Sequence, residues 1–316
     1  MEFFIITIAG LLLFFNFNAP QSGAGFLEKA KAGNEGISAN HLVPAKHIVF
    51  PYRPKGVPLF NPQELSAQSV AVRDESTGRI LFQKDAYNKR PIASLTKLMT
   101  ALVWFEVDGN LEQIVEIKSD DYREGSIPYF IAGDKVKTKD LLYTGLVASS
   151  NSAMVALARS AGYAPADFIK LMNDKAVELG MKDTVFVEPT GLDSRNMSTA
   201  TDLFILARNA FNNPEITRAT QLSGYSFRPL NGGTVRSVAS TDWLLNSSAN
   251  SGDYKIIGGK TGYIEESNYN LVLKIRNKEK GKDLIVVVLG SEDVGARFAE
   301  AKKLIEWAYH NYIWDI

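Results

Sequence analysis

Two kinds of hydrophobic pattern divide this chain of 316 residues. Short runs rich in aliphatic and β-branched residues lie near both ends of the sequence, and each pair of runs flanks a turn. Residues 68–73 and 79–83 surround Ser76-Thr77-Gly78, and residues 270–276 and 283–290 surround a charged turn. Both arrangements predict β-hairpins.

Between the two predicted hairpins, apolar residues recur every three or four positions, which is the spacing of helices. The predicted helices cover residues 95–105, 140–147, 153–161, 166–179, 201–211 and, after the second hairpin, 296–309. Strands from both ends of the chain around a helical middle indicate an α+β fold, with one antiparallel β-sheet flanked by helices and a mainly helical lobe. We expect the active site to open between the sheet and this lobe.

The first residues form an apolar segment of a different kind. Residues 3–15 are almost wholly apolar, a length typical of a signal-peptide core and shorter than the about 20 residues of a membrane-spanning helix. No basic residue precedes this segment, so an uncleaved N-terminal membrane anchor is the alternative. We therefore divide the chain into a signal peptide or anchor (1–22), a linker (23–62) and one globular domain (63–316), which we expect to be exported to the cell-wall space.

The composition excludes several kinds of chemistry. The chain has no cysteine, and its histidines are His41, His47 and His310, two of which precede the predicted domain. Thiol catalysis, disulfides, a Ser-His-Asp triad and a histidine-rich metal site are therefore not expected, and we predict no cofactor. Lys and Arg together number 35 and balance 35 Asp and Glu, so the charge gives no reason to expect nucleic acid as a partner.

A serine and a lysine three positions apart give the strongest chemical signal. Ser94-Leu95-Thr96-Lys97 is the only Ser-x-x-Lys in the chain, and it stands at the start of a predicted helix. Residues three apart share one helix face, so we expect the Lys97 amine beside the Ser94 hydroxyl. Taken alone, the pattern fits a helix-capping serine and a solvated lysine equally well.

The apolar residues that follow Lys97 indicate that its side chain enters the protein. Burial disfavours a charged amine, and a second cation nearby, for which Lys260 is the candidate, acts in the same direction. Lys97 is thereby predicted to be an uncharged base that accepts the Ser94 proton. Such a base would take the place of the histidine that this chain lacks.

Lys260-Thr261-Gly262 lies in the apolar segment 254–263, which we predict to be a strand. The small residues of this segment allow another backbone to approach it closely. Its N–H groups are expected to bind a substrate edge, and Thr261 to donate to a substrate carboxylate. A phosphate-binding loop would need glycine where the chain has Tyr254, so we exclude that alternative.

Ser149-Ser150-Asn151 lies between the other two motifs. Ser-x-Asn triplets recur elsewhere in this sequence, so this triplet is informative only because of its position between those motifs. Together with Pro91 to Leu102 and Thr190-Gly191-Leu192-Asp193, the three motifs resemble those of the low-molecular-mass penicillin-binding proteins of the D-alanyl-D-alanine carboxypeptidase and endopeptidase type. The resemblance begins near Ser66 and covers most of the sequence. It implies the fold of serine β-lactamases and transpeptidases.

The resemblance also implies a role for each matching residue. Ser94 would be the acylated nucleophile and Lys97 its base. Ser149, Asn151 and Lys260 would relay protons and orient the substrate.

The predicted strand would supply the substrate-binding residues Thr261, Gly262 and Tyr263. Thr261 would hold the terminal carboxylate of the substrate, and the backbone N–H groups of Ser94 and Tyr263 would form the oxyanion hole. Arg297, near the start of the last predicted helix, would be a second carboxylate contact. A surface arginine is the alternative for that position.

The implied activity is that of a serine-type D-Ala-D-Ala carboxypeptidase, with peptidoglycan stem peptides as substrate and β-lactam antibiotics as covalent inhibitors. A D,D-endopeptidase that cleaves peptidoglycan cross-links uses the same chemistry and is the nearest alternative. A catalytically inactive cell-wall-binding relative is an alternative of a different class. A class A β-lactamase is disfavoured because the chain has no Glu-x-x-Leu-Asn segment.

Overall fold

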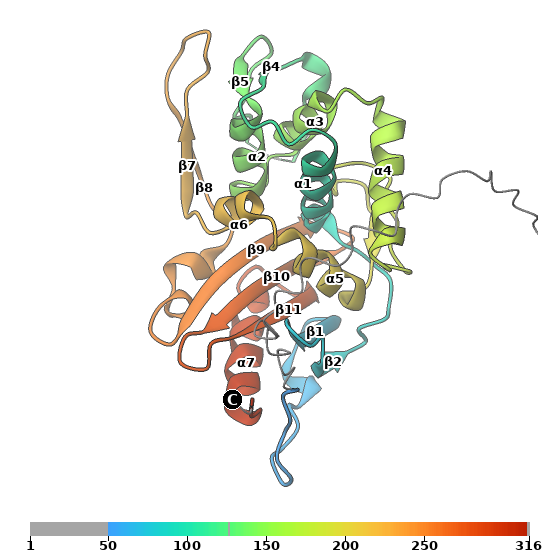
Figure 1. Cartoon of the computed structure of the whole chain (residues 1–316), viewed down its shortest axis with the longest axis vertical. Coiled ribbons are helices and arrows are strands. Elements are labelled where there is room, and N and C mark those ends of the chain that lie inside the picture. The colour runs from blue at the N-terminus through green and yellow to red at the C-terminus, as the bar shows by residue number, and fades with distance from the viewer. Residues whose placement is uncertain (1–49, 126, 315–316) are drawn as a thin grey trace, which may run out of the picture. The chain divides into compact units, whose positions relative to one another are not determined.

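The computed structural model describes residues 50–125 and 127–314 (Figure 1). The predicted signal peptide or anchor and the predicted linker up to residue 49 lie outside the described residues. Within the described ranges, no helix combines the length and the apolar character that crossing a bilayer requires.

A five-stranded antiparallel sheet stands at the centre of the fold (Figure 1). Its strands, in spatial order, are β2 (Ile80–Lys84), β1 (Ser69–Asp74), β11 (Lys282–Ser291), β10 (Asn268–Asn277) and β9 (Tyr254–Ile264). The N-terminal hairpin joins the C-terminal strands where β1 pairs with β11, for example Val72 opposite Val286. The prediction of one antiparallel sheet built from both ends of the chain is confirmed.

Strand β11 explains why helices cover both faces of the sheet. Its side chains alternate between two hydrophobic cores: Leu284, Val286 and Val288 belong to one, and Ile285, Val287 and Leu289 to the other. Each of these fully buried side chains contributes about 1.5–3 kcal/mol to stability. Because β11 is apolar at every position from Leu284 to Leu289, it requires cover on both sides.

Helix α7 packs on one face of the sheet, and the helical lobe packs on the other (Figure 1). The helices are α1 (Thr96–Val107), α2 (Thr138–Val147), α3 (Asn151–Ser160), α4 (Pro165–Glu178), α5 (Ala200–Ala210), α6 (Pro214–Thr220) and α7 (Ala296–Asn311). All except α6 begin and end within two residues of the predicted bounds. The predicted α+β class is confirmed.

The sequence did not predict three small two-stranded sheets. They are β3 (Arg90–Pro91) with β6 (Met197–Ser198), β4 (Ile114–Glu116) with β5 (Lys135–Lys137), and β7 (Gly224–Phe227) with β8 (Arg236–Ala239). The β7–β8 hairpin is held to the helical lobe by an ion pair between Arg236 and Asp134, and by the Leu230 N–H, which donates to the Lys135 carbonyl. The hairpin thereby stands beside the cleft described below.

The first described residues pack on the globular domain. Tyr52 forms a β-bridge with Ile313 after α7. The Phe60 ring meets the rings of Phe82 and Trp307 edge to face, with centroids 5.2 and 5.7 Å away. Phe60 therefore joins the core that α7 forms with the sheet.

Candidate active site

Ser94 lies in a short 3₁₀ turn, Ala93–Leu95, that leads directly into α1. The sequence placed Ser94 in the first turn of the helix itself, so the turn before α1 is a small correction. Leu95 is fully buried and anchors this turn in the core. Ala93 has φ +49°, a left-handed conformation that a non-glycine residue adopts only when its surroundings hold it there.

The Lys97 amine lies one turn further along, where it is wholly buried, as the sequence predicted. Its Nζ is 2.7 Å from each of three oxygens: Ser94 Oγ, Asn151 Oδ1 and the Thr190 carbonyl. A neutral amine has two hydrogens and one lone pair. Because the amide and carbonyl oxygens take the two hydrogens, the lone pair is directed at the Ser94 hydroxyl.

Burial makes the neutral form of Lys97 accessible near neutral pH. Desolvation lowers the pKa of Lys97 to about 7, and the negative charge of Glu188 acts in the opposite direction. A pKa in this range suits a general base, because such a base is deprotonated often enough to act and still binds the proton it receives.

The segment Ser149-Ser150-Asn151 performs three tasks with three consecutive residues. Ser149 Oγ accepts a hydrogen bond from Lys260 Nζ at 2.8 Å, and Ser149 has φ +58°. Ser150 caps the N-terminus of α3 by accepting from the Ala153 N–H. Asn151 turns its side chain toward Lys97. The two residues that flank the helix cap thus contact different lysines, Ser149 the amine of Lys260 and Asn151 the amine of Lys97.

Lys260 is a second buried amine, on the strand β9. It donates to Ser149 Oγ and to the Thr261 carbonyl, each at 2.8 Å. Burial, followed by repulsion from Lys97 and Arg297, holds the pKa of Lys260 well below its usual range. The expected repulsion between the two lysines thus helps to lower the pKa of Lys260. The pKa of Lys97 reflects two other effects: burial lowers it, and the negative charge of Glu188 raises it.

Strand β9 passes directly against the nucleophile turn, and Gly262 makes this approach possible. A Cβ at Gly262 would lie 3.0 Å from the Ile92 carbonyl oxygen and 3.1 Å from the Ser94 backbone nitrogen. The next side chain, Tyr263, is 52% exposed and stacks on Tyr269 with ring centroids 4.5 Å apart. The backbones of Ser94 and Tyr263 therefore approach one another beside the cleft.

Arg297 lies inside the protein, so the alternative of a surface arginine is wrong. Its side chain is 6% exposed, and Nη1 donates to the carbonyls of Gly262 and Asn270 at 3.2 and 3.4 Å. Burial lowers the pKa of Arg297 to about 10, and the nearby Asp242 acts in the opposite direction. The guanidinium supplies positive charge behind β9.

Several of these residues line one cleft of about 350 Å³. Its lining consists of Ser94, Gly125, Ile127, Tyr129, Ala148, Ser149, Asn151, Gly191, Leu192, Ala239, Thr241, Thr261, Gly262, Tyr263, Ile264 and Arg297. The lining combines polar side chains such as Ser94 and Thr261 with apolar side chains such as Ile127 and Leu192. Lys97 and Lys260 do not line the cleft themselves, but they form hydrogen bonds with the lining residues Ser94, Asn151 and Ser149.

Sequence reasoning missed two contributors to the site. Thr241 lines the cleft, and its Oγ1 is 2.5 Å from Thr261 Oγ1. Glu188 acts on Lys97 from the loop that carries Thr190. Neither residue belongs to a motif, although the resemblance had drawn attention to the segment that begins at Thr190. Among the described residues, no group of three or more His, Cys, Asp or Glu side chains is arranged to hold a metal ion.

Comparison with known proteins agrees with this geometry. The family described as D-alanyl-D-alanine carboxypeptidase matches residues 58–293. A D-alanyl-D-alanine endopeptidase of Pseudomonas aeruginosa is 33% identical over 256 residues, which cover 80% of this chain and 79% of that protein. The D-alanyl-D-alanine carboxypeptidase DacF of Bacillus subtilis is 30% identical over 258 residues, covering 78% of this chain and 63% of that protein.

Solved structures show the same fold. The crystal structure of the Streptomyces K15 DD-transpeptidase has a TM-score of 0.72 and 29% sequence identity, and the match covers 80% of this chain and 100% of that one. With a family match that spans most of the chain and a relative that is 33% identical, this chain belongs to the D-alanyl-D-alanine carboxypeptidase family of serine peptidases, the low-molecular-mass penicillin-binding proteins.

Proposed function

We propose that the protein is a serine-type D-Ala-D-Ala carboxypeptidase that acts on peptidoglycan stem peptides. Ser94 attacks the carbonyl carbon of the penultimate D-alanine, and Lys97 accepts the hydroxyl proton. The terminal D-alanine leaves with a proton delivered through Ser149 and Lys260, and water then hydrolyses the acyl ester on Ser94. The 2.7 Å contact between Ser94 Oγ and the buried Lys97 amine is the observation that carries this proposal.

The remaining polar groups of the cleft bind the substrate in this proposal. Thr261 and Thr241 donate to the terminal carboxylate, and the positive charge of Arg297 attracts it. The backbone N–H groups of Ser94 and Tyr263 stabilise the negative oxygen of the tetrahedral intermediate. β-Lactams acylate the same serine and act as covalent inhibitors.

A D,D-endopeptidase is the second candidate. It performs the same acylation, but its leaving group is a whole cross-linked peptide. Small side chains, those of Ala148 and Ala239, line the cleft together with Thr241 and Thr261, and in this proposal the cleft accepts a leaving group larger than D-alanine. The Pseudomonas aeruginosa relative, which is named an endopeptidase, also supports this candidate.

Digestion of two substrates side by side distinguishes the candidates. The purified protein is incubated with a muropeptide that ends in D-Ala-D-Ala and with a cross-linked muropeptide, and the products are separated by chromatography and identified by mass. Release of D-alanine from the first supports the carboxypeptidase, and faster cleavage of the second supports the endopeptidase. If a fluorescent penicillin also fails to label the protein, both are wrong and an inactive wall-binding relative is favoured.

The first residues bear on where this activity takes place. We propose that residues 1–22 direct export and that the enzyme works in the extracytoplasmic cell-wall space, with an uncleaved N-terminal anchor as the form attached to the membrane. The mass of the protein purified from the cell envelope tests this directly. A mass that lacks the leader supports a signal peptide, and the full-length mass together with membrane fractionation supports the anchor.

A further inference from the structure

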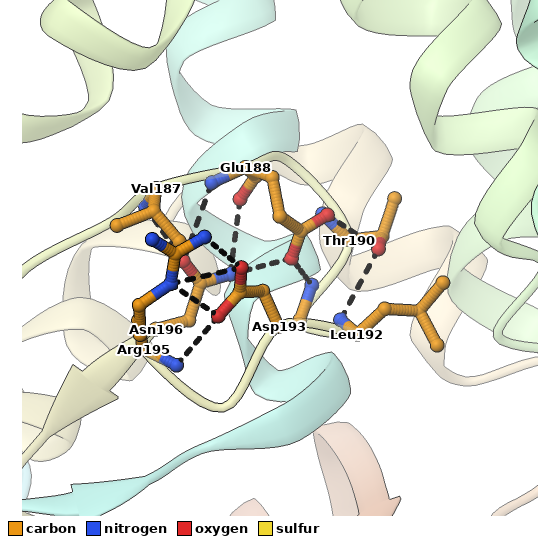
Figure 2. A network of polar contacts seen from close by, with 8 residues as sticks. Val187, Glu188, Thr190, Leu192, Asp193, Arg195 and Asn196 are labelled. Carbon is orange, nitrogen blue, oxygen red and sulfur yellow. Dashed lines mark hydrogen bonds and ion pairs between the residues drawn. The ribbon is translucent and has the colours of Figure 1, made fainter.

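The loop from Val187 to Asn196 folds around one carboxylate, that of Glu188 (Figure 2). One carboxylate oxygen accepts from the Thr190 N–H at 2.8 Å and from the Thr190 hydroxyl at 2.6 Å. The other accepts from the Gly191 N–H and from the amide of Asn196 at 2.7 Å. Glu188 therefore satisfies two consecutive backbone donors of its own loop.

These hydrogen bonds determine the direction of one peptide plane. In a trans peptide the N–H and the C=O point in opposite directions, and the described chain has no cis peptide bond. Because the Gly191 N–H points to Glu188, the Thr190 carbonyl of the same peptide unit points away from it. That carbonyl accepts from Lys97 Nζ at 2.7 Å. Glu188 thus orients the acceptor that takes one of the two hydrogens of the Lys97 amine.

The nucleophile turn holds the same loop in place from the other side. Gly191 has φ +86°, and its Cα lies so close to the Ala93 backbone that a Cβ would be 1.8 Å from the Ala93 carbonyl oxygen. The buried Asn196 ties the loop to Thr96 in α1 and, through its backbone carbonyl, to the Ile92 N–H. A small movement of Glu188 would therefore shift the groups that position both Lys97 and Ser94.

The charges around Lys97 give Glu188 a second effect. The groups that face the amine from the turn Ala93–Leu95 and from α3 are the neutral Ser94 and Asn151, and strand β9 contributes Lys260, whose pKa Lys97 helps to lower. Arg297 and the buried Asp242 act on Lys260 in opposite directions. Glu188 is the anion whose charge acts on Lys97. It therefore favours the ammonium that Lys97 becomes when it takes a proton.

We propose that Glu188 is a positioning residue for acyl transfer: its carboxylate aims the Thr190 carbonyl at Lys97 and stabilises the Lys97 ammonium that forms when Ser94 gives up its proton. The proton moves from Ser94 Oγ to Lys97 Nζ while the serine oxygen bonds to the carbonyl carbon, and the C=O π bond breaks with its electron pair passing to the carbonyl oxygen. This inference rests on the proposed role of Lys97 as the base.

The test measures the rate of acylation by a fluorescent penicillin as a function of pH in the full protein and two variants. Glu188→Gln keeps the size of the side chain and removes its charge. We expect the midpoint of the rising limb to move to lower pH by about one unit, as for loss of a nearby opposite charge, and the maximal rate to fall at least tenfold. Glu188→Asp keeps the charge but shortens the reach, so its maximal rate should fall while its midpoint stays near that of the wild type.

Asp202→Asn is the matched control, because the Asp202 carboxylate likewise accepts a backbone N–H, that of Asp183, and a threonine hydroxyl, that of Thr184. This variant should lose stability without a change of midpoint. An unchanged midpoint in Glu188→Gln would overturn the electrostatic part of the inference. Acylation of Glu188→Asp at the wild-type maximal rate would overturn the positioning part, even if Glu188→Gln does not fold. If the wild type itself is not acylated, the proposed function fails, and this inference fails with it.

Discussion

Replacing Gly191 by alanine should separate the loop that carries Thr190 from the nucleophile turn. A Cβ at this position would lie 1.8 Å from the Ala93 carbonyl oxygen and 2.8 Å from the Ser94 backbone nitrogen, both backbone atoms that cannot turn aside. To reach an ordinary contact, the two backbones must separate by roughly 1.5 Å. The φ of +86° adds a second cost, because alanine adopts left-handed conformations reluctantly.

The structure allows an estimate of both effects. The left-handed conformation costs alanine about 1 kcal/mol, and overpacking a well-packed site costs about 1–3 kcal/mol more. Gly191→Ala should therefore lower the free energy of unfolding by about 2–4 kcal/mol. The same shift breaks the 2.7 Å contact between Lys97 and the Thr190 carbonyl, and a displacement of about 1 Å at a catalytic group costs about 100-fold in rate.

Gly180→Ala is the matched control. Gly180 has φ +79°, and a Cβ there would meet nothing within 4 Å, so this variant carries the conformational cost alone. Urea denaturation gives the free energy of unfolding of both variants, and labelling with a fluorescent penicillin gives their acylation rates. We expect Gly180→Ala to lose about 1 kcal/mol and to acylate normally. The reasoning is refuted if Gly191→Ala loses no more stability than Gly180→Ala and acylates at the wild-type rate.

Three further predictions follow from the geometry. Lys97→Ala should slow acylation by about 10²–10⁴-fold while noncovalent penicillin binding persists, and the wild-type rate should rise with pH around a midpoint near 7; a flat profile would eliminate Lys97 as the base. Burial raises the pKa of Asp242 to about 6, so the folded state binds this proton more tightly than the unfolded state does, and stability falls as pH rises from about 4 to 6. Asp242→Asn should remove about 2–3 kcal/mol of that fall, and identical urea-denaturation profiles against pH in both proteins would show that the carboxyl does not titrate there. Phe60→Ala should cost about 3 kcal/mol in the same unfolding assay, because the ring is buried in the core under α7; no loss would mean that residues 50–62 are only loosely attached.

The sequence predicted those helices and strands whose own residues carry a long, regular pattern of apolar positions. Strand β11 and helices α1 and α5 repeat apolar residues over many positions, and the structure has them where the pattern placed them. The β7–β8 hairpin has only four residues in each strand. It is held by tertiary contacts such as the Tyr225 hydroxyl on Asp140, which no local pattern reveals.

The same distinction applies to the candidate site. The proximity of Ser94 and Lys97 follows from helical spacing, and the burial of Lys97 follows from the apolar residues beside it. Glu188 and Thr241 act through contacts with residues distant in sequence or in an irregular segment, so no spacing rule points to them. For Arg297 the sequence allowed two interpretations, a carboxylate contact or a surface arginine. A position near the start of a helix does not indicate whether a side chain is buried, and the burial of Arg297 is seen only in the structure.

The central claim is that the Ser94 hydroxyl is the nucleophile and that a buried amine accepts its proton. The most direct measurement is mass spectrometry of the penicillin-treated protein after proteolysis, with the adduct located by peptide mapping at several pH values. Our account predicts one penicilloyl group on Ser94, which forms faster as pH rises through about 7. An adduct on Ser149 or on any other residue, or an adduct on Ser94 that forms at the same rate after Lys97 is removed, would contradict it.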